Sequence, residues 1–184
     1  MFSMGIGSFL MEKKFIRSPV LTLLKVEIFL TIIGGFAVVS LHLLNILGPS
    51  RLLFILIAHL IIIAVGILTG AEIPLLIEIR NKEKNNSENS ILGVDYTGAL
   101  VGTILFAFVF YPHIGLVPTG FLIGFLNSIV GILLFTQRTK VLSEDRRKYY
   151  SSLSVQVFLC AIITICILNS QAINEYFINK YLEH

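Results

Sequence analysis

Five apolar stretches of about 20 residues constrain the fold of this chain more than any other feature. They cover about residues 19–44, 52–79, 91–111, 119–136 and 150–169. An α-helix needs roughly 20 mainly apolar residues to cross the hydrocarbon core of a bilayer. Each stretch therefore predicts one membrane-spanning helix. The fold class that follows is all-α, a polytopic transmembrane helix bundle.

The composition agrees with a membrane protein. Of the 184 residues, 55% are hydrophobic, and the charged residues are 14 Lys and Arg and 11 Asp and Glu. The mean hydropathy of +0.88 is far above that of a soluble domain. Soluble enzymes, nucleic-acid binders and disordered chains are excluded. The net charge of +3 follows from membrane orientation, so it indicates no nucleic-acid or acidic partner.

The opening run, Met1 to Met11, is apolar but only about half as long as a span. It is either a re-entrant or surface segment, or the second half of a helix whose beginning lies outside this chain. The basic residues Lys13, Lys14 and Arg17 follow this run, so it does not read as a cleavable signal peptide. We expect five full spans preceded by an N-terminal half-span.

The basic residues predict an orientation in the membrane. Segments 12–18, 80–90 and 137–149 hold 11 of the 14 Lys and Arg residues. By the positive-inside rule these loops are cytoplasmic. Residues 1–170 then form a transmembrane helical domain, and 171–184 form a short extracytoplasmic tail. The chain's last residues, Leu182 to His184, are either the remnant of an appended tag or a natural ending.

Three acidic residues fall inside predicted spans: Glu27, Glu72 and Asp95. An acid at mid-membrane costs about 2.5 to 3.5 kcal/mol on insertion scales, so each needs a compensating partner. All three lie toward the cytoplasmic ends of their helices and could meet in one polar pocket, with Lys25 or Arg80 as a counter-charge. They either fix helix packing through such pairs or form a ligand or proton site.

Proline and glycine shape the same spans. Pro74 follows Glu72 by two residues and removes a backbone hydrogen bond, which predicts a polar gap near Glu72 that is either a binding notch or a kink. Small residues four apart let helix backbones approach closely in lipid. Such pairs are Gly66 and Gly70, Gly98 and Gly102, and Gly120 and Gly124. Asp95 shares a face with Gly98 and Gly102, so it is expected at a tight interface.

No residue pattern supports catalysis or metal binding. Cys160 and Cys166 are six residues apart on one predicted helix and face different ways, so they form neither a disulfide nor a metal pair. The histidines have no second ligand at i+3 or i+4. No arrangement typical of nucleophilic catalysis accompanies the serines or cysteines. We expect no cofactor, no metal and no catalytic residue.

Several motifs together resemble a known family. They are Phe2–Leu10 (FSMGIGSFL), Glu27 followed by Gly34-Gly35, Gly70–Pro74 (GAEIP), and Val94–Gly102 (VDYTGALVG) running on to Pro112 and Gly115-Leu116. They resemble the membrane domain of bacterial membrane-bound spermidine synthase-like proteins, which are polyamine aminopropyltransferases. The resemblance covers about residues 1–136 and implies a multi-pass location in the bacterial inner membrane. It also implies a further helix before the FSMGIGSFL stretch.

The resemblance also implies what these residues lack. The family's catalytic domain resembles a Rossmann-type methyltransferase, with a Gly-rich loop after its first strand. No such loop, and no alternation of strand and helix, follows residue 170. No catalytic residue of the family can therefore be placed on this sequence. We expect the membrane part without the enzyme.

The leading functional hypothesis is a non-catalytic membrane module that anchors or partners an aminopropyltransferase domain. Because polyamines are cations, Glu27, Glu72, Asp95 and Tyr96 are the candidate ligands for putrescine or spermidine. The alternative is a small polyamine or cation transporter or channel, for which five and a half helices would require a homo-oligomer formed through the glycine faces. An enzyme in its own right is the third hypothesis.

Overall fold

The computed structural model of the chain describes residues 1–11, 18–81 and 88–182. Every regular element within these ranges is helical. The elements are α1 (Phe2–Leu10), α2 (Pro19–Ile46), α3 (Arg51–Asn81), α4 (Glu88–Leu105), the π-helix η2 (Phe106–Phe110), α5 (Tyr111–His113), α6 (Leu116–Leu133), the 3-10 helices η3 (Leu134–Lys140) and η4 (Ser143–Asp145), α7 (Arg146–Leu168) and α8 (Ser170–Leu182).

The predicted fold class is confirmed. Five helical segments are long and apolar enough to cross a membrane: Pro19–Ile46, Arg51–Arg80, Asn89–His113, Leu116–Lys140 and Ser143–Leu168. The predicted stretches fall at the same places, with boundaries that differ by at most seven residues. A helix suits these sequences because it pairs backbone N–H and C=O groups within the segment, which an apolar surrounding requires.

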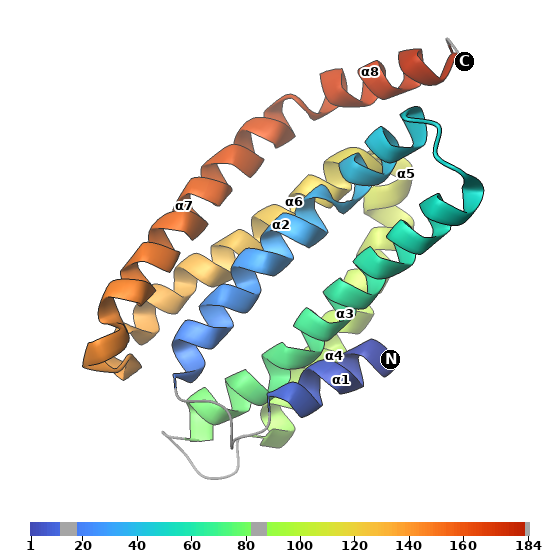
Figure 1. The fold of residues 1–184 in the computed structure, drawn as a ribbon. Helices are drawn as coiled ribbons and strands as arrows, with labels where there is room; N and C mark the ends of the chain where they lie inside the picture. Colours follow the sequence, from blue (N-terminus) through green and yellow to red (C-terminus); the bar gives the residue numbers. More distant parts are fainter. Residues whose placement is uncertain (12–17, 82–87, 183–184) are drawn as a thin grey trace.

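Helix α2 lies at the centre of the bundle (Figure 1). It packs against α6, α3 and α7, and α7 also packs on α6. Helices α2 and α6 approach each other closely, since a Cβ added at Gly124 would lie 2.7 Å from the Cα of Gly35. Nearby, the rings of Phe36 and Phe121 meet edge to face with centroids 5.7 Å apart.

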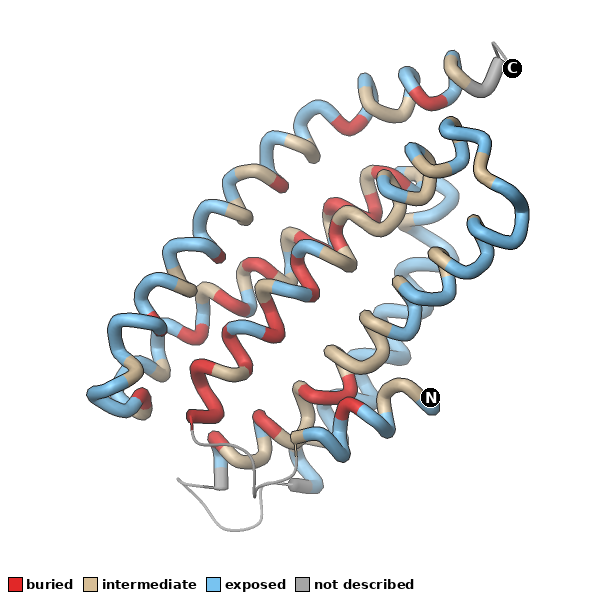
Figure 2. The backbone as a smooth tube through the Cα atoms, in the orientation of Figure 1, coloured by how far each residue is buried: buried red, intermediate tan, exposed pale blue. Residues whose placement is uncertain are grey.

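The buried residues lie mainly where these helices pack against one another (Figure 2). One apolar cluster joins the first half of α2 to the second half of α3 and to the α6–α7 connection. A second cluster joins the other end of α2 to α6, α7 and α8. The span that contains α4 has no buried residue and packs mainly on α3. Most of the α4 surface is therefore open to the surroundings of the bundle.

The N-terminal half-span is the short helix α1, which lies along α3 near the end of the bundle that holds the C-terminus of α3 (Figure 1). The two backbones are in very close contact. A Cβ added at Gly66 would overlap Ser3, one at Gly70 would overlap the backbone of Met4, and one at Gly7 would overlap the backbone of Ile67. Gly66 and Gly70 of α3 thus form the surface on which α1 packs.

The α6–α7 connection is a compact pair of 3-10 helices. Tyr149 is fully buried, and its hydroxyl donates a 2.8 Å hydrogen bond to the carbonyl of Leu134. The Nζ of Lys140 donates to the carbonyl of Ile79 at 3.3 Å. These two bonds tie the connection to the start of α7 and to the end of α3.

The C-terminal segment differs from the sequence reading, which identified no helix there. Residues Ser170–Leu182 form α8, which packs on α6, α2 and α7. Phe177 is buried, and its ring lies 5.0 Å from that of His42. The basic segment at 12–17, residues 82–87 of the next basic segment, and the final Glu183 and His184 lie outside the described residues.

We predict that Gly70→Ala destabilises the bundle by about 1–3 kcal/mol, because the new Cβ overlaps the Met4 backbone and forces α1 away from α3. The measurement is thermal unfolding in detergent. Gly98→Ala is the matched control, since it is also a glycine inside a span and its Cβ would meet no atom within 4 Å. Equal stability of the two variants would contradict the α1–α3 contact.

We predict that Tyr149→Phe lowers the free energy of unfolding by about 1–3 kcal/mol, because it leaves the Leu134 carbonyl without this donor in a buried place. Tyr150→Phe changes the adjacent residue, which is 46% exposed, and is expected to have little effect. Denaturant titration of both variants checks the difference. A loss in Tyr150→Phe as large as in Tyr149→Phe would contradict the proposed role of the buried hydroxyl.

Candidate functional site

The three acids singled out by the sequence are neighbours in the structure. Glu27 on α2 is buried, with 4% of its surface exposed. Its carboxylate interacts electrostatically with that of Glu72 on α3, and Glu72 in turn interacts with Asp95 on α4. Glu72 is therefore the middle member of a row of carboxylates contributed by three successive long helices.

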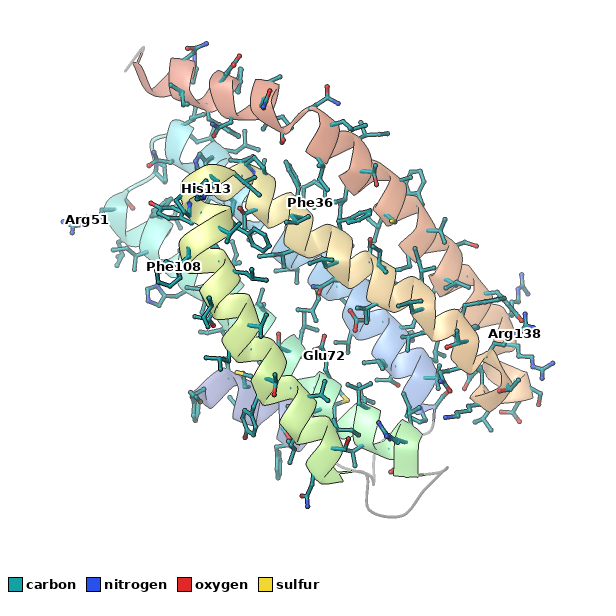
Figure 3. The ribbon with its side chains drawn as sticks, turned by 180° about the vertical axis from the view of Figure 1, so that it is seen from behind. Phe36, Arg51, Glu72, Phe108, His113 and Arg138 are labelled. Carbon is teal, nitrogen blue, oxygen red and sulfur yellow. The ribbon has the colours of Figure 1, made fainter. Side chains whose placement is uncertain are left out.

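Two of these acids line a pocket of about 850 Å³ bounded by α3, α4, α6 and η3. Figure 3 labels Glu72 beside α4. The apolar walls come from Ile73, Leu76, Ile79, Ile91, Val94, Val130, Leu133 and Leu134. Glu72 from α3 and Asp95 from α4 are the acidic lining residues.

A second polar group lines the same pocket near the ends of α3 and η3. It consists of Arg80, Ser90, Thr136, Gln137 and Lys140. Glu72 lies eight residues before Arg80 on α3, which places the two about 12 Å apart along the helix axis. The pocket thus has an acidic region, in which Glu72 is half-buried and Asp95 is exposed, and a basic, donor-rich region near the ends of α3 and η3, which we call its mouth. Apolar side chains lie between the two regions.

This arrangement has the chemistry that a site for an organic cation needs. Neighbouring carboxylates in a poorly hydrated place repel one another, and an ammonium group placed between them relieves the repulsion. Apolar walls next to the carboxylates suit the methylene chain of an organic amine. Among the described residues no group of three or more His, Cys, Asp and Glu could hold a metal ion.

Other residues predicted for the site are placed differently. Glu27 does not line the pocket, but its carboxylate interacts electrostatically with that of the lining residue Glu72. Tyr96 is 71% exposed and lies outside the lining. Of the two suggested counter-charges, Arg80 lines the pocket, whereas Lys25 is exposed on α2. Pro74 lies inside α3, which continues through it, next to the lining residue Ile73.

The glycine pairs fall into two groups. Gly66 and Gly70 contact α1, and Gly120 and Gly124 contact α2 at Val38 and Gly35. Gly98 and Gly102 were expected to form the same kind of interface beside Asp95. A Cβ added at either would meet no atom within 4 Å in the described part of the chain. The tight interface expected on α4 is therefore not made by the described residues.

Sequence reasoning missed one polar contact in the centre of the bundle. Gln156 on α7 is fully buried, and its Nε2 donates to the hydroxyl of Thr31 on α2 at 3.1 Å. The same nitrogen lies 3.5 Å from the carbonyl oxygen of Asn127 on α6. A long amide side chain inside the apolar 150–169 stretch was the available signal. It joins three helices, but it does not line the pocket.

The basic mouth was also missed in part. Arg80 was predicted as a counter-charge. Gln137 and Lys140 come from segment 137–149, which was predicted only to be a basic cytoplasmic loop. The bond from Lys140 to Ile79, across 61 residues of sequence, is what brings this loop to the pocket. No local pattern in the sequence predicts that contact.

The fold and the pocket define a polytopic α-helical bundle of the kind that crosses membranes. Its pocket, between α3, α4, α6 and η3, is lined by charged and apolar side chains. Comparison with known proteins places the chain more narrowly. It is 39% identical over 137 residues to a polyamine aminopropyltransferase of Leptospira interrogans, across 73% of this chain and 26% of that protein. A protein of the same name from Oceanobacillus iheyensis is 36% identical over 135 residues, across 71% of this chain and 26% of the relative.

A third relative, polyamine aminopropyltransferase 2 of Aquifex aeolicus, is 31% identical over 164 residues, across 86% of this chain and 31% of the relative. These matches confirm the resemblance to the membrane domain of spermidine synthase-like proteins, and the chain is homologous to one part of the polyamine aminopropyltransferases. It spans about a quarter of the length of the Leptospira and Oceanobacillus relatives. No family model matches the chain, and no solved structure matches it.

Proposed function

We propose that this chain is an integral membrane module of the aminopropyltransferase family that binds an organic polyamine cation in the pocket between α3, α4 and α6. The observation that carries the proposal is the pair Glu72 and Asp95, which line one pocket and interact electrostatically. Carboxylates in the apolar part of a membrane helix are costly unless a partner compensates them. A bound ammonium group would be such a partner.

The shape and lining of the pocket support a polyamine over a simple metal cation. A volume of about 850 Å³ is far larger than a bare ion needs, and most of the lining is aliphatic. A linear amine would place its nitrogen atoms at the carboxylates and its methylene groups against the half-buried side chains of Ile73 and Ile91. Putrescine and spermidine have this chemistry, and the relatives' name refers to polyamines.

The membrane location and the partner belong to the same proposal. The five long apolar helices support insertion in the bacterial inner membrane. The basic residues around the α6–α7 connection support a cytoplasmic position for that end of the bundle. An aminopropyltransferase domain, in the same polypeptide or in a partner protein, would then be held at the membrane next to a site that binds polyamines.

We predict that Glu72→Gln and Asp95→Asn each weaken spermidine binding by about tenfold or more, because each removes a charge-assisted contact to an ammonium group. Isothermal calorimetry in detergent, with putrescine and spermidine as titrants, measures the change. Glu175→Gln on α8 is the matched control, since that acid is exposed and lies outside the pocket. Unchanged binding in both pocket variants would overturn the proposed site.

We predict that liposomes containing the purified protein show no spermidine uptake above that of protein-free liposomes. This outcome distinguishes a binding module from the alternative of a polyamine or cation transporter. Radiolabelled spermidine, with vesicles of matched lipid composition, provides the measurement. Uptake that Asp95→Asn abolishes would favour transport through the same pocket, in which case the carboxylates would belong to a translocation pathway.

A further inference from the structure

The mouth of the pocket carries charges that a polyamine site does not explain. Arg80 and Lys140 lie there together with the side chains of Gln137 and Ser90. Two cations at the entrance would repel a polyamine instead of attracting it. The mouth therefore presents positive charge and hydrogen-bond donors, which are the groups that recognise a phosphate.

Lys140 is held at the mouth by a hydrogen bond. Lys140 donates to the carbonyl of Ile79, which brings the end of η3 next to the end of α3 and so next to Arg80. Tyr149 fixes the other end of η3 through Leu134. A guanidinium group offers a planar pair of donors that fits phosphate oxygens in a bidentate manner. Arg80 is exposed and can present this edge at the mouth.

The location of the mouth is that of a membrane interface. Arg80 and Lys140 are the last residues of two of the membrane-spanning segments. Beside them, the guanidinium of Arg138 lies 4.7 Å from the centre of the Phe135 ring, and Phe135 is 41% exposed. Basic and aromatic side chains of this kind are enriched where a membrane helix meets the headgroup layer.

Directly beyond the mouth, the pocket is apolar and open at its side. Leu76, Val94, Val130 and Leu133 line it and are 41%, 71%, 47% and 58% exposed. These side chains belong to the part of the bundle that the hydrocarbon layer would surround, so lipid chains are the natural material to cover them. A phosphate site that opens onto exposed aliphatic side chains matches one kind of molecule, in which a phosphate is joined to acyl chains.

We propose that the mouth formed by Arg80, Lys140, Gln137 and Ser90 binds the phosphate of an anionic phospholipid, whose acyl chains lie along the exposed side chains of α3, α4 and α6. A free phosphate would make no contact with the apolar side chains, and a lipid without net charge would be attracted less strongly to the two cations. The mouth lies about two turns of helix from the carboxylates, so this inference holds whether or not a polyamine binds there.

The test is native mass spectrometry of the purified protein with phosphatidylglycerol or with phosphatidylcholine of the same acyl chains. We expect phosphatidylglycerol to bind in preference. We expect Arg80→Gln to weaken its binding about fivefold, the effect of one cation near a lipid surface, while Arg80→Lys keeps most of the affinity. Arg51→Gln is the matched control, since this exposed arginine lies at the opposite end of the bundle from Arg138 (Figure 3).

Three outcomes would overturn the lipid site: equal binding of the two lipids, unchanged phosphatidylglycerol binding in Arg80→Gln, or the same loss in Arg51→Gln. Competition on the unaltered protein is a further measurement that needs no variant. Displacement of phosphatidylglycerol by excess inorganic phosphate would show a site for phosphate alone and would overturn the lipid assignment. Spermidine binding, measured on the same samples, reports separately on Glu72 and Asp95.

Discussion

The close approach of α2 and α6 at Gly35 and Gly124 is the contact on which the bundle depends. Any side chain larger than hydrogen at Gly124 would meet the Cα of Gly35. Apolar side chains gain little from leaving lipid for a protein interior, so helices in membranes associate through such close packing and through interhelical hydrogen bonds. With α2 and α6 in contact, α7 docks on both, and α3 docks on the other side of α2.

The same principle separates the well-packed part of the molecule from the open part. Gln156 and Thr31 add a buried hydrogen bond between α7 and α2, and the glycines of α3 hold α1. Within the described residues, helix α4 has no buried side-chain hydrogen bond to another helix and no close glycine contact, because a Cβ added at Gly98 or Gly102 would meet no atom within 4 Å. It therefore leaves space beside α3, and this space is the pocket. The lightly packed helix carries Asp95, so the candidate site lies where the bundle is least dense.

The pocket combines two kinds of charge in one apolar frame. Cations from α3 and η3 lie at the end of the bundle, and carboxylates from α3 and α4 lie about two turns of helix away from them. Each kind can be compensated by a ligand of opposite charge without disturbing the other, because about two turns of helix separate them. A polyamine among the carboxylates and an anionic lipid at the mouth would together neutralise the lining. The two proposals are thus compatible, although each rests on its own residues.

The sequence by itself determined the number and positions of the long helices, because the length and hydropathy of a span are local properties. It also identified Glu27, Glu72 and Asp95 as residues that need partners, since the desolvation of an acid follows from its position within an apolar span. Which residues the acids meet was decided by tertiary structure. The contact of Lys140 with Ile79, the burial of Gln156 and the openness of Gly98 and Gly102 depend on how helices far apart in sequence are packed, and the four-residue spacing of glycines is the same in a closed interface as in an open one.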